Sequence, residues 1–172
     1  MIADENSSWC DFARIENVLL SWCPFESSSS VHGLLHWHRV EKIGLWLADR
    51  NGADKMVVRL FALLHDSQRL NDDSDPGHGE RAAKFAASLR GQVFDMHNEV
   101  FELLVYTCTR HTEGLLSTDV TIGTCWDADR LDLSRVGIVP SEQFMSTKAG
   151  KEMAGSGTFY ESQNSKGSEH IQ

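Results

Sequence analysis

The sequence lacks several features that would assign its 172 residues to a secreted, membrane or cysteine-bound zinc protein. It has no apolar run of the ~20 residues that cross a bilayer, and its N-terminus lacks the basic segment and apolar core of a secretion signal. No Cys-x-x-Cys pair is present, so we expect reduced thiols rather than zinc ligands at Cys10, Cys23, Cys108 and Cys125. These absences predict a cytoplasmic protein with no membrane partner.

Positive charge is also scarce. The chain has 16 lysines and arginines against 25 aspartates and glutamates, a formal net charge of −9. Because general binding to nucleic acids relies on a basic surface that neutralises phosphates, we expect no nucleic-acid polymer as a partner. A small anionic substrate is compatible with this charge if a metal ion and nearby arginines reverse the local field.

Apolar residues recur every three to four positions through most of the chain, which predicts an all-α fold. With 41% hydrophobic residues, the chain can bury the core of one compact domain. We expect an N-terminal helix and linker packed on the core over 1–30, the main helical domain over 31–150, and a flexible tail over 151–172. The expected helices cover residues 9–22, 31–50, 54–66, 78–90, 94–111 and 126–134, with one more short helix within 141–153.

Some helix boundaries are marked by residues that favour caps and turns. Asn51-Gly52 is typical of a helix C-terminus. Asp75-Pro76 indicates an N-cap followed by proline at the first helical position. Residues 118–125 are small and β-branched, and we expect them to form a connector between helices.

Three stretches place imidazoles or carboxylates at the polar end of an otherwise apolar helical pattern. They are HWHRV at 36–40, LLHDSQR at 63–69 and WDADRLD at 126–132. Such groups cost a large free energy when they are buried without partners. A shared metal ion would satisfy them, so the sequence predicts a metal site at which the three stretches meet.

The helical repeat separates the histidines of the first stretch. His36, Val40 and Ile43 follow one face of the helix, so His36 points where the core points. His38 lies about 200° round the helix from His36, so the two cannot face the same ion. His32 lies one turn earlier on nearly the same side as His36, and is a candidate for the pocket mouth or for a group behind the ligands.

The order of the motifs along residues 32–140 resembles that of the HD-domain superfamily of metal-dependent phosphohydrolases. The resemblance is carried by His-x-x-Arg-Val at 36–40, the adjacent pair His65-Asp66 and Ala-Asp-x-Leu-Asp at 128–132. It implies an HD-domain helical bundle built around a metal site.

The resemblance also implies which residues hold the ion, namely His36, His65, Asp66 and Asp129. It selects His36 as the histidine three residues before the arginine, and Asp129 as the aspartate that follows alanine. On the residues alone, Asp127 and Asp132 compete with Asp129. We expect Asp132 to orient a ligand or to support Arg130, and Asp127 to be structural or solvated.

A second metal ion is suggested by two further histidines. In the dinuclear branch of the superfamily, two histidines between the His-Asp pair and the final aspartate hold a second ion. His78 and His111 occupy these places by order and by helical setting. The alternatives are that His78 is an exposed residue at a helix start and that the helix dipole favours His111 at a C-terminus.

Two imidazoles and two carboxylates form a mixed nitrogen and oxygen set that suits Mn²⁺, Fe²⁺, Co²⁺, Ni²⁺, Zn²⁺ or Mg²⁺. A metal-bound water would then serve as the nucleophile near neutral pH. We expect Asp66 to act both as a ligand and as the group that orients the attacking water. Arg69, three residues later, is expected to contact a phosphate, and a surface arginine at a helix end is the alternative.

Other side chains are weaker candidates for contact with the substrate. Other arginines could also reach a phosphate, although arginine is usually solvated or in salt bridges. They are Arg39, Arg81, Arg110 and Arg130. Some tryptophans could stack on a nucleotide base, although tryptophans at helical spacing more often belong to the core. They are Trp37, Trp46 and Trp126.

Missing signatures narrow the expected function. The chain has Ser67-Gln68 where the stringent-response hydrolases carry a Glu-Asp pair, and it lacks the Gly-Tyr-Pro signature of the cyclic-dinucleotide branch. We therefore expect a stand-alone hydrolase, a phosphomonoesterase or phosphodiesterase, acting on a nucleotide or other small phosphate ester. The alternatives are an HD-fold di-iron oxygenase and a non-catalytic sensor of metal or nucleotide. The sequence does not identify the substrate or the metal. It also leaves the oligomeric state open, and a homodimer is among the alternatives.

Overall fold

The computed structural model of the protein describes residues 8–24 and 30–156, and its architecture confirms the expected all-α class. The α-helices are α1 (Phe12–Trp22), α2 (Leu34–Asn51), α3 (Lys55–Leu64), α4 (His78–Leu89), α5 (Asn98–Arg110), α6 (Val120–Leu131) and α7 (Lys148–Ser156). Short 3-10 helices are η1 (His111–Glu113), η2 (Asp132–Val136) and η3 (Glu142–Phe144). A small antiparallel sheet pairs β1 (Trp9–Cys10) with β2 (Phe94–Asp95).

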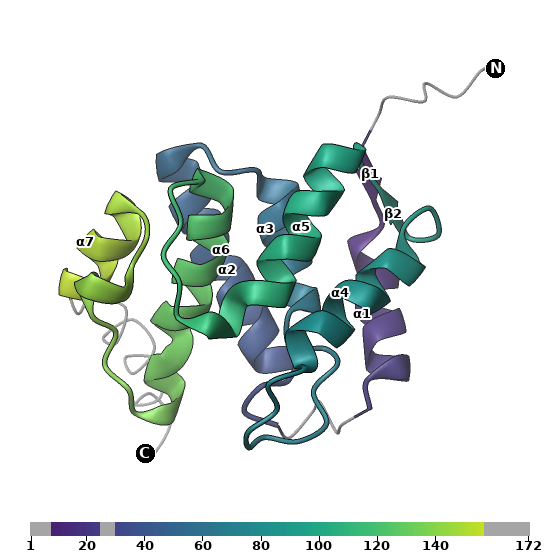
Figure 1. Ribbon diagram of the computed structural model, residues 1–172, viewed down its shortest axis with the longest axis horizontal. Helices are drawn as coiled ribbons and strands as arrows, with labels where there is room; N and C mark the ends of the chain where they lie inside the picture. The colour runs from purple at the N-terminus through teal and green to yellow at the C-terminus, as the bar shows by residue number, and fades with distance from the viewer. Residues whose placement is uncertain (1–7, 25–29, 157–172) are drawn as a thin grey trace, which may run out of the picture.

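Helix α2 lies at the centre of the bundle, where it packs along both α3 and α6. Helices α4 and α5 pack on each other, and α5 also contacts α3 and α6. Figure 1 shows α7 at one edge of the bundle and α1 at the opposite edge. Trp37, Phe61 and Trp126 are buried in this core, so these two tryptophans are packing residues, whereas Trp46 is partly exposed beneath the Arg50 guanidinium.

Helix α3 brings the His-Asp pair into the interior. The Asp54 carboxylate accepts hydrogen bonds from the backbone N–H groups of Met56 and Val57, which caps the first turn. The helix is apolar on nearly every side, and its residues from Val57 onward are buried except Arg59. It ends at Leu64, so His65 and Asp66 emerge at the inner end of a buried helix.

Two expected helices begin later than the apolar pattern indicates. Helix α1 starts at Phe12 instead of residue 9, and α5 starts at Asn98 instead of residue 94. The reason is the pairing of Trp9–Cys10 with Phe94–Asp95, which commits both segments to extended backbone. This contact joins residues far apart in the sequence, and no local pattern contains it.

Two predictions about helix starts were wrong. Residues 118–125 are not a connector, because Asp119 accepts hydrogen bonds from the backbone of Thr121 and Ile122 and starts α6 at Val120. Asp75 is not an N-cap, since α4 begins at His78 after Gly77. The Asp75 carboxylate instead accepts from the Leu70 N–H and forms an ion pair with Arg81.

The C-terminal part of the described chain is anchored by a buried carboxylate. Asp127 accepts hydrogen bonds from the Ser146 N–H, the Thr147 N–H and the Thr147 hydroxyl, at 2.7–2.8 Å. These bonds hold the start of α7, which includes residues 151–156 of the expected tail. Residues 157–172 lie outside the described part, and the proposed division at residues 30 and 150 stays a prediction. Among the described helices, none combines the length and apolar composition needed to cross a bilayer.

Candidate metal centre

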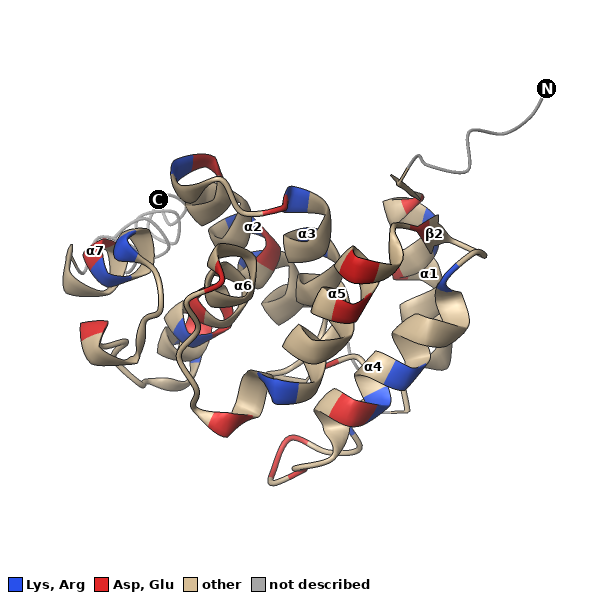
Figure 2. Cartoon of the chain, turned by 45° about the horizontal axis from the view of Figure 1, so that its top comes forward, with Lys and Arg blue, Asp and Glu red and all other residues tan. Residues whose placement is uncertain are grey.

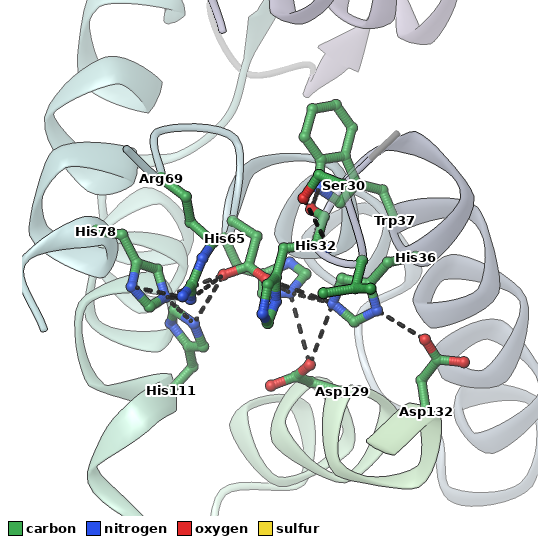
Figure 3. Close-up of polar contacts among 12 residues, drawn as sticks. Ser30, His32, His36, Trp37, His65, Arg69, His78, His111, Asp129 and Asp132 are labelled. Atoms are coloured by element: carbon green, nitrogen blue, oxygen red, sulfur yellow. Dashed lines mark hydrogen bonds and ion pairs between the residues drawn. The ribbon is translucent and has the colours of Figure 1, made fainter. Parts of the chain in front are cut away.

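Side chains from α2, α6 and the end of α3 converge inside the bundle (Figure 3). The Nε2 atom of His36 lies 3.1 Å from Nε2 of His65, 3.6 Å from Oδ2 of Asp66 and 3.4 Å from Oδ1 of Asp129. His65 Nε2 lies 3.7 Å from the same two carboxylate oxygens. The structure thus brings together all four residues that the resemblance implies as ligands.

The hydrogen bonds behind the two imidazoles fix the direction of their lone pairs. His36 Nδ1 lies 2.7 Å from Asp132 Oδ2, and His65 Nδ1 lies 3.0 Å from the Phe61 carbonyl oxygen. Carboxylate and carbonyl oxygens only accept, so each Nδ1 carries the proton and donates it. The Nε2 atoms therefore present their lone pairs towards each other, an arrangement that a cation between them stabilises.

The spacing of these donor atoms fits a single divalent ion. Donor atoms bound about 2.1 Å from an ion stand about 3.0 Å apart at right angles and about 3.4 Å apart in a tetrahedron. The two imidazole nitrogens lie 3.1 Å apart, and each lies 3.4–3.7 Å from the two carboxylate oxygens. Two imidazole nitrogens and two carboxylate oxygens are also a donor set that divalent transition metals accept.

A second cluster lies on the other side of Asp66. His78, the first residue of α4, and His111, directly after α5, have Nε2 atoms 2.9 Å apart. Their Nδ1 atoms donate to the carbonyl oxygens of Asp75 and Cys108, at 2.5 and 2.6 Å. As in the first cluster, both Nε2 lone pairs therefore face a common point.

Asp66 joins the two clusters through its two oxygens. Oδ2 faces His36 and His65, whereas Oδ1 lies 3.0 Å from His78 Nε2 and 3.6 Å from His111 Nε2. Oδ1 is buried, and among the described residues it forms no hydrogen bond. A buried carboxylate oxygen without a hydrogen bond is costly, so this atom fits a position that a second cation would share.

A glycine permits the second cluster to form. A Cβ added to Gly79 would lie 2.5 Å from the Cys108 carbonyl oxygen and 3.0 Å from the carbonyl oxygen of Thr109. Real side chains do not approach backbone oxygens so closely, so α4 can pack against the end of α5 only with glycine here. His78 precedes this glycine, and the close approach places it against His111.

Electrostatics favour positive charge at the centre. Burial opposes ionisation of Asp66 and Asp129, but neighbouring imidazoles outweigh it and hold the pKa of both carboxyls well below the usual range. For His36, burial lowers the pKa, whereas hydrogen bonds to Asp129 and Asp132 raise it above its ordinary value. Ionised carboxylates facing basic nitrogens attract a proton or a metal cation.

Arg69 lies at the second cluster and is held by the loop that follows it. Its Nε and Nη2 atoms donate to the carbonyl oxygens of Asn71 and Asp73, and Nη1 lies 3.6 Å from Asp66 Oδ1. Nη1 also lies 3.3 Å from His78 Nδ1. The side chain is nearly buried, so it is not the surface arginine of the alternative, and its contact with a phosphate stays a prediction.

The remaining candidates lie away from the centre or make other contacts. His38 is exposed and pairs with Glu16, at 3.0 Å, away from the centre. Asp127 is buried but binds the backbone at the start of α7. The other candidate arginines make structural contacts. Arg39 donates to Asp132, Arg81 to Asp75, Arg110 to Glu113, and Arg130 to backbone carbonyl oxygens.

Reasoning from the sequence did not identify Arg135, which lies near the centre beside His32. His32 Nδ1, at the expected pocket mouth, lies 2.9 Å from Asp66 Oδ2 and 3.2 Å from Nη2 of Arg135. Arg135 stands three residues after Asp132, and this spacing was the available signal. Its proximity to His32 depends on tertiary packing between η2 and the turn before α2.

No protein-family model matches the sequence, and no curated protein matches it significantly. Solved structures do resemble it. A predicted HD superfamily hydrolase from an uncultured Thermotogales bacterium superposes with a TM-score of 0.67 and 22% identity, over 90% of this chain and 88% of that one. An HD-superfamily hydrolase from Bacillus thuringiensis gives a TM-score of 0.58 and 18% identity, over 90% and 93% of the two chains. The chain therefore has the fold of the HD superfamily.

Proposed function

We propose that this protein is a metal-dependent hydrolase, and more specifically a phosphohydrolase that acts on a nucleotide or another small phosphate ester. The observation that carries the proposal is the facing pair of His36 and His65 Nε2 atoms, 3.1 Å apart, with carboxylate oxygens of Asp66 and Asp129 around them. Both solved structures that resemble the chain are described as HD superfamily hydrolases.

Two groups of residues are proposed to hold an ion each. His36, His65, Asp66 and Asp129 would hold the first, and Asp66 with His78 and His111 would hold the second. When bound, a divalent ion lowers the pKa of a coordinating water towards about 7 and draws electron density from a phosphoryl oxygen.

The protein's own groups orient the candidate ligands and exclude solvent from the centre. Asp132 and the Phe61 carbonyl fix the ring orientation of the two histidines, so their Nε2 atoms stay aimed at the centre. His36 and His65 are fully buried, which excludes solvent from the rear of the centre. Because water is excluded there, the electrostatic interactions between the centre and negative charge that develops on a substrate are stronger.

The charges around the centre support an anionic substrate. Arg69 faces Asp66, and Arg39 and Arg135 face Asp132, so the charges of these three guanidinium groups nearly cancel those of Asp66, Asp129 and Asp132. Each added divalent ion then makes the centre more positive. Figure 2 shows Lys and Arg interleaved with Asp and Glu over the helices, so attraction for an anion would arise at the centre itself.

Metal analysis followed by a substrate screen tests this function. Protein purified without added metal should contain Mn, Fe, Co, Ni, Zn or Mg. It should hydrolyse members of a panel of phosphomonoesters, nucleotides and phosphodiesters when Mn²⁺, Co²⁺, Ni²⁺ or Mg²⁺ is supplied. Bound metal without hydrolysis of any ester would contradict the proposal and favour the sensor. Iron with an oxygen-dependent absorption band and no hydrolysis would favour the oxygenase.

A further inference from the structure

The centre is open to solvent on one side. Among its described side chains, His32 and Asp129 keep 22% and 20% of their surface exposed, whereas His36 and His65 keep none and Asp66 keeps 4%. A substrate must therefore approach past His32 and Asp129. Any residue that binds the substrate beside the first ion has to lie along this side.

Arg135 is a rigidly held cation on the same side. Its Nε donates to the Val31 carbonyl oxygen, at 2.8 Å, and its Nη1 donates to the Asp132 carbonyl oxygen, at 3.1 Å. The bond to Val31 ties the 3-10 helix η2 to the turn before α2. The two bonds leave Nη2 directed at His32 Nδ1, 3.2 Å away.

The distance from Arg135 to the first cluster suits a bridging phosphoryl group. Nη2 and Asp66 Oδ2 contact the same atom, His32 Nδ1, at 3.2 and 2.9 Å, so they are no more than about 6 Å apart. A phosphoryl group that binds a cation through one oxygen and a guanidinium through another spans about this distance.

We infer that Arg135 binds the phosphoryl group of the substrate at the open side of the centre, and that His32 flanks the same position. This inference rests on the proposed function. Arginine suits the role because its planar donors match phosphate oxygens, and two backbone carbonyls hold it in place before substrate arrives.

The other arginines near the centre are less suited. Arg69 lies at the second cluster, where carbonyl oxygens of the following loop engage its Nε and Nη2. Arg39 donates to Asp132 Oδ1 at 2.7 Å, and Asp132 contacts His36 on its Nδ1 side, behind the face that meets the ligands. Arg135 Nη1 also lies 3.6 Å from Asp132 Oδ2, but of these three arginines only Arg135 contacts His32 at the opening, through Nη2.

Binding of inorganic phosphate to the Mn²⁺-loaded full chain tests the inference by calorimetry. Arg135→Gln should weaken phosphate binding at least about tenfold, the effect of losing a charged hydrogen-bond donor, while the affinity for Mn²⁺ stays at the wild-type value. Arg135→Lys keeps the charge but loses the planar pair of donors, so it should bind phosphate with intermediate affinity. Arg50→Gln is the matched control, because Arg50 lies at the far end of α2 over Trp46.

The outcomes separate this inference from the function on which it rests. Wild-type phosphate affinity in a folded Arg135→Gln protein that keeps its Mn²⁺ would overturn the inference and leave the hydrolase intact. A wild-type protein that binds no divalent metal would overturn both. If circular dichroism shows that Arg135→Gln is unfolded, Arg135→Lys decides: weaker phosphate binding supports the inference, and unchanged binding overturns it.

Discussion

At the scale of single residues, Asp66 is the side chain on which both clusters depend. Its Oδ2 faces His36 and His65, and its Oδ1 faces His78 and His111. All four imidazoles direct Nε2 towards it, because each Nδ1 donates to an oxygen behind the ring. This one carboxylate would therefore be shared by the two proposed cation positions.

Removal of this carboxylate should empty both positions. We expect Asp66→Ala to lose all bound metal and all hydrolytic activity, since each position loses its shared anionic ligand. Elemental analysis of purified protein, together with the ester panel, measures both effects. His38→Ala is the control and should match wild type, because His38 pairs with Glu16 away from the centre. Wild-type metal content in Asp66→Ala would disprove the assignment.

Removal of one histidine of the second cluster should have a smaller effect. His78 contacts Asp66 only through Oδ1, so His78→Ala should lower the metal content from two ions to one per chain. The His36 and His65 contacts stay in place, and the remaining ion should keep its affinity. Titration with Mn²⁺ under competition by a chelator measures both values. An unchanged stoichiometry would mean that His78 is only a structural residue at the start of α4.

At the scale of the elements, helix contacts set the geometry of the candidate ligands. Helix α3 ends just before His65, α4 begins at His78, and α5 ends just before His111, so these candidate ligands stand at helix ends. Each depends on where its helix meets the next one. The contact of α4 with α5 is the tightest at Gly79, whose missing Cβ leaves room for two carbonyl oxygens.

A methyl group at this contact should push the two helices apart. We expect Gly79→Ala to lower the free energy of unfolding by about 1–3 kcal/mol, as overpacking does, and to weaken the second metal position more than the first. Urea denaturation and Mn²⁺ titration measure these effects. Gly77→Ala is the control, because the methyl group there meets only the end of the Arg81 side chain. Equal effects in the two variants would contradict the explanation.

The convergence of the candidate ligands was easier to predict from the sequence than the bounds of the elements that carry them. His36 was separable from His38 because a helical face is a local property, visible as a repeat, whereas Asp129 was selected over Asp127 by the resemblance. The strand at Trp9–Cys10 was not predictable, because its partner lies at Phe94–Asp95. The start of α6 was missed because one cap at Asp119 outweighs the β-branched residues that follow.

At the scale of the whole molecule, the candidate ligands connect most of the bundle. They come from α2, α4, α6 and the segments that follow α3 and α5, so an ion at the centre would link elements that are distant in the chain. Arg135 extends this connection to η2. Its position could not be predicted, since it depends on how η2 packs against the turn before α2.

Metal binding should therefore stabilise the fold as a whole. At a free ion concentration one hundred times the dissociation constant, each site contributes about 2.7 kcal/mol, which corresponds to a rise in Tm of about 5–10 °C for a domain of this size. Differential scanning calorimetry with and without Mn²⁺, after treatment with a chelator, measures the shift. A Tm that stays the same with Mn²⁺, Co²⁺, Ni²⁺, Zn²⁺ and Mg²⁺ would contradict binding at the centre.

The division of the Asp66 oxygens between two clusters has a thermodynamic consequence. An ion on one oxygen would fix the rotamer that the other proposed site requires, and at the same time would repel a second ion across a few ångströms. The two occupancies would then be linked, with a coupling free energy that is the same whichever ion arrives first. Any neighbour that turns this one side chain, such as His32, would change both affinities together.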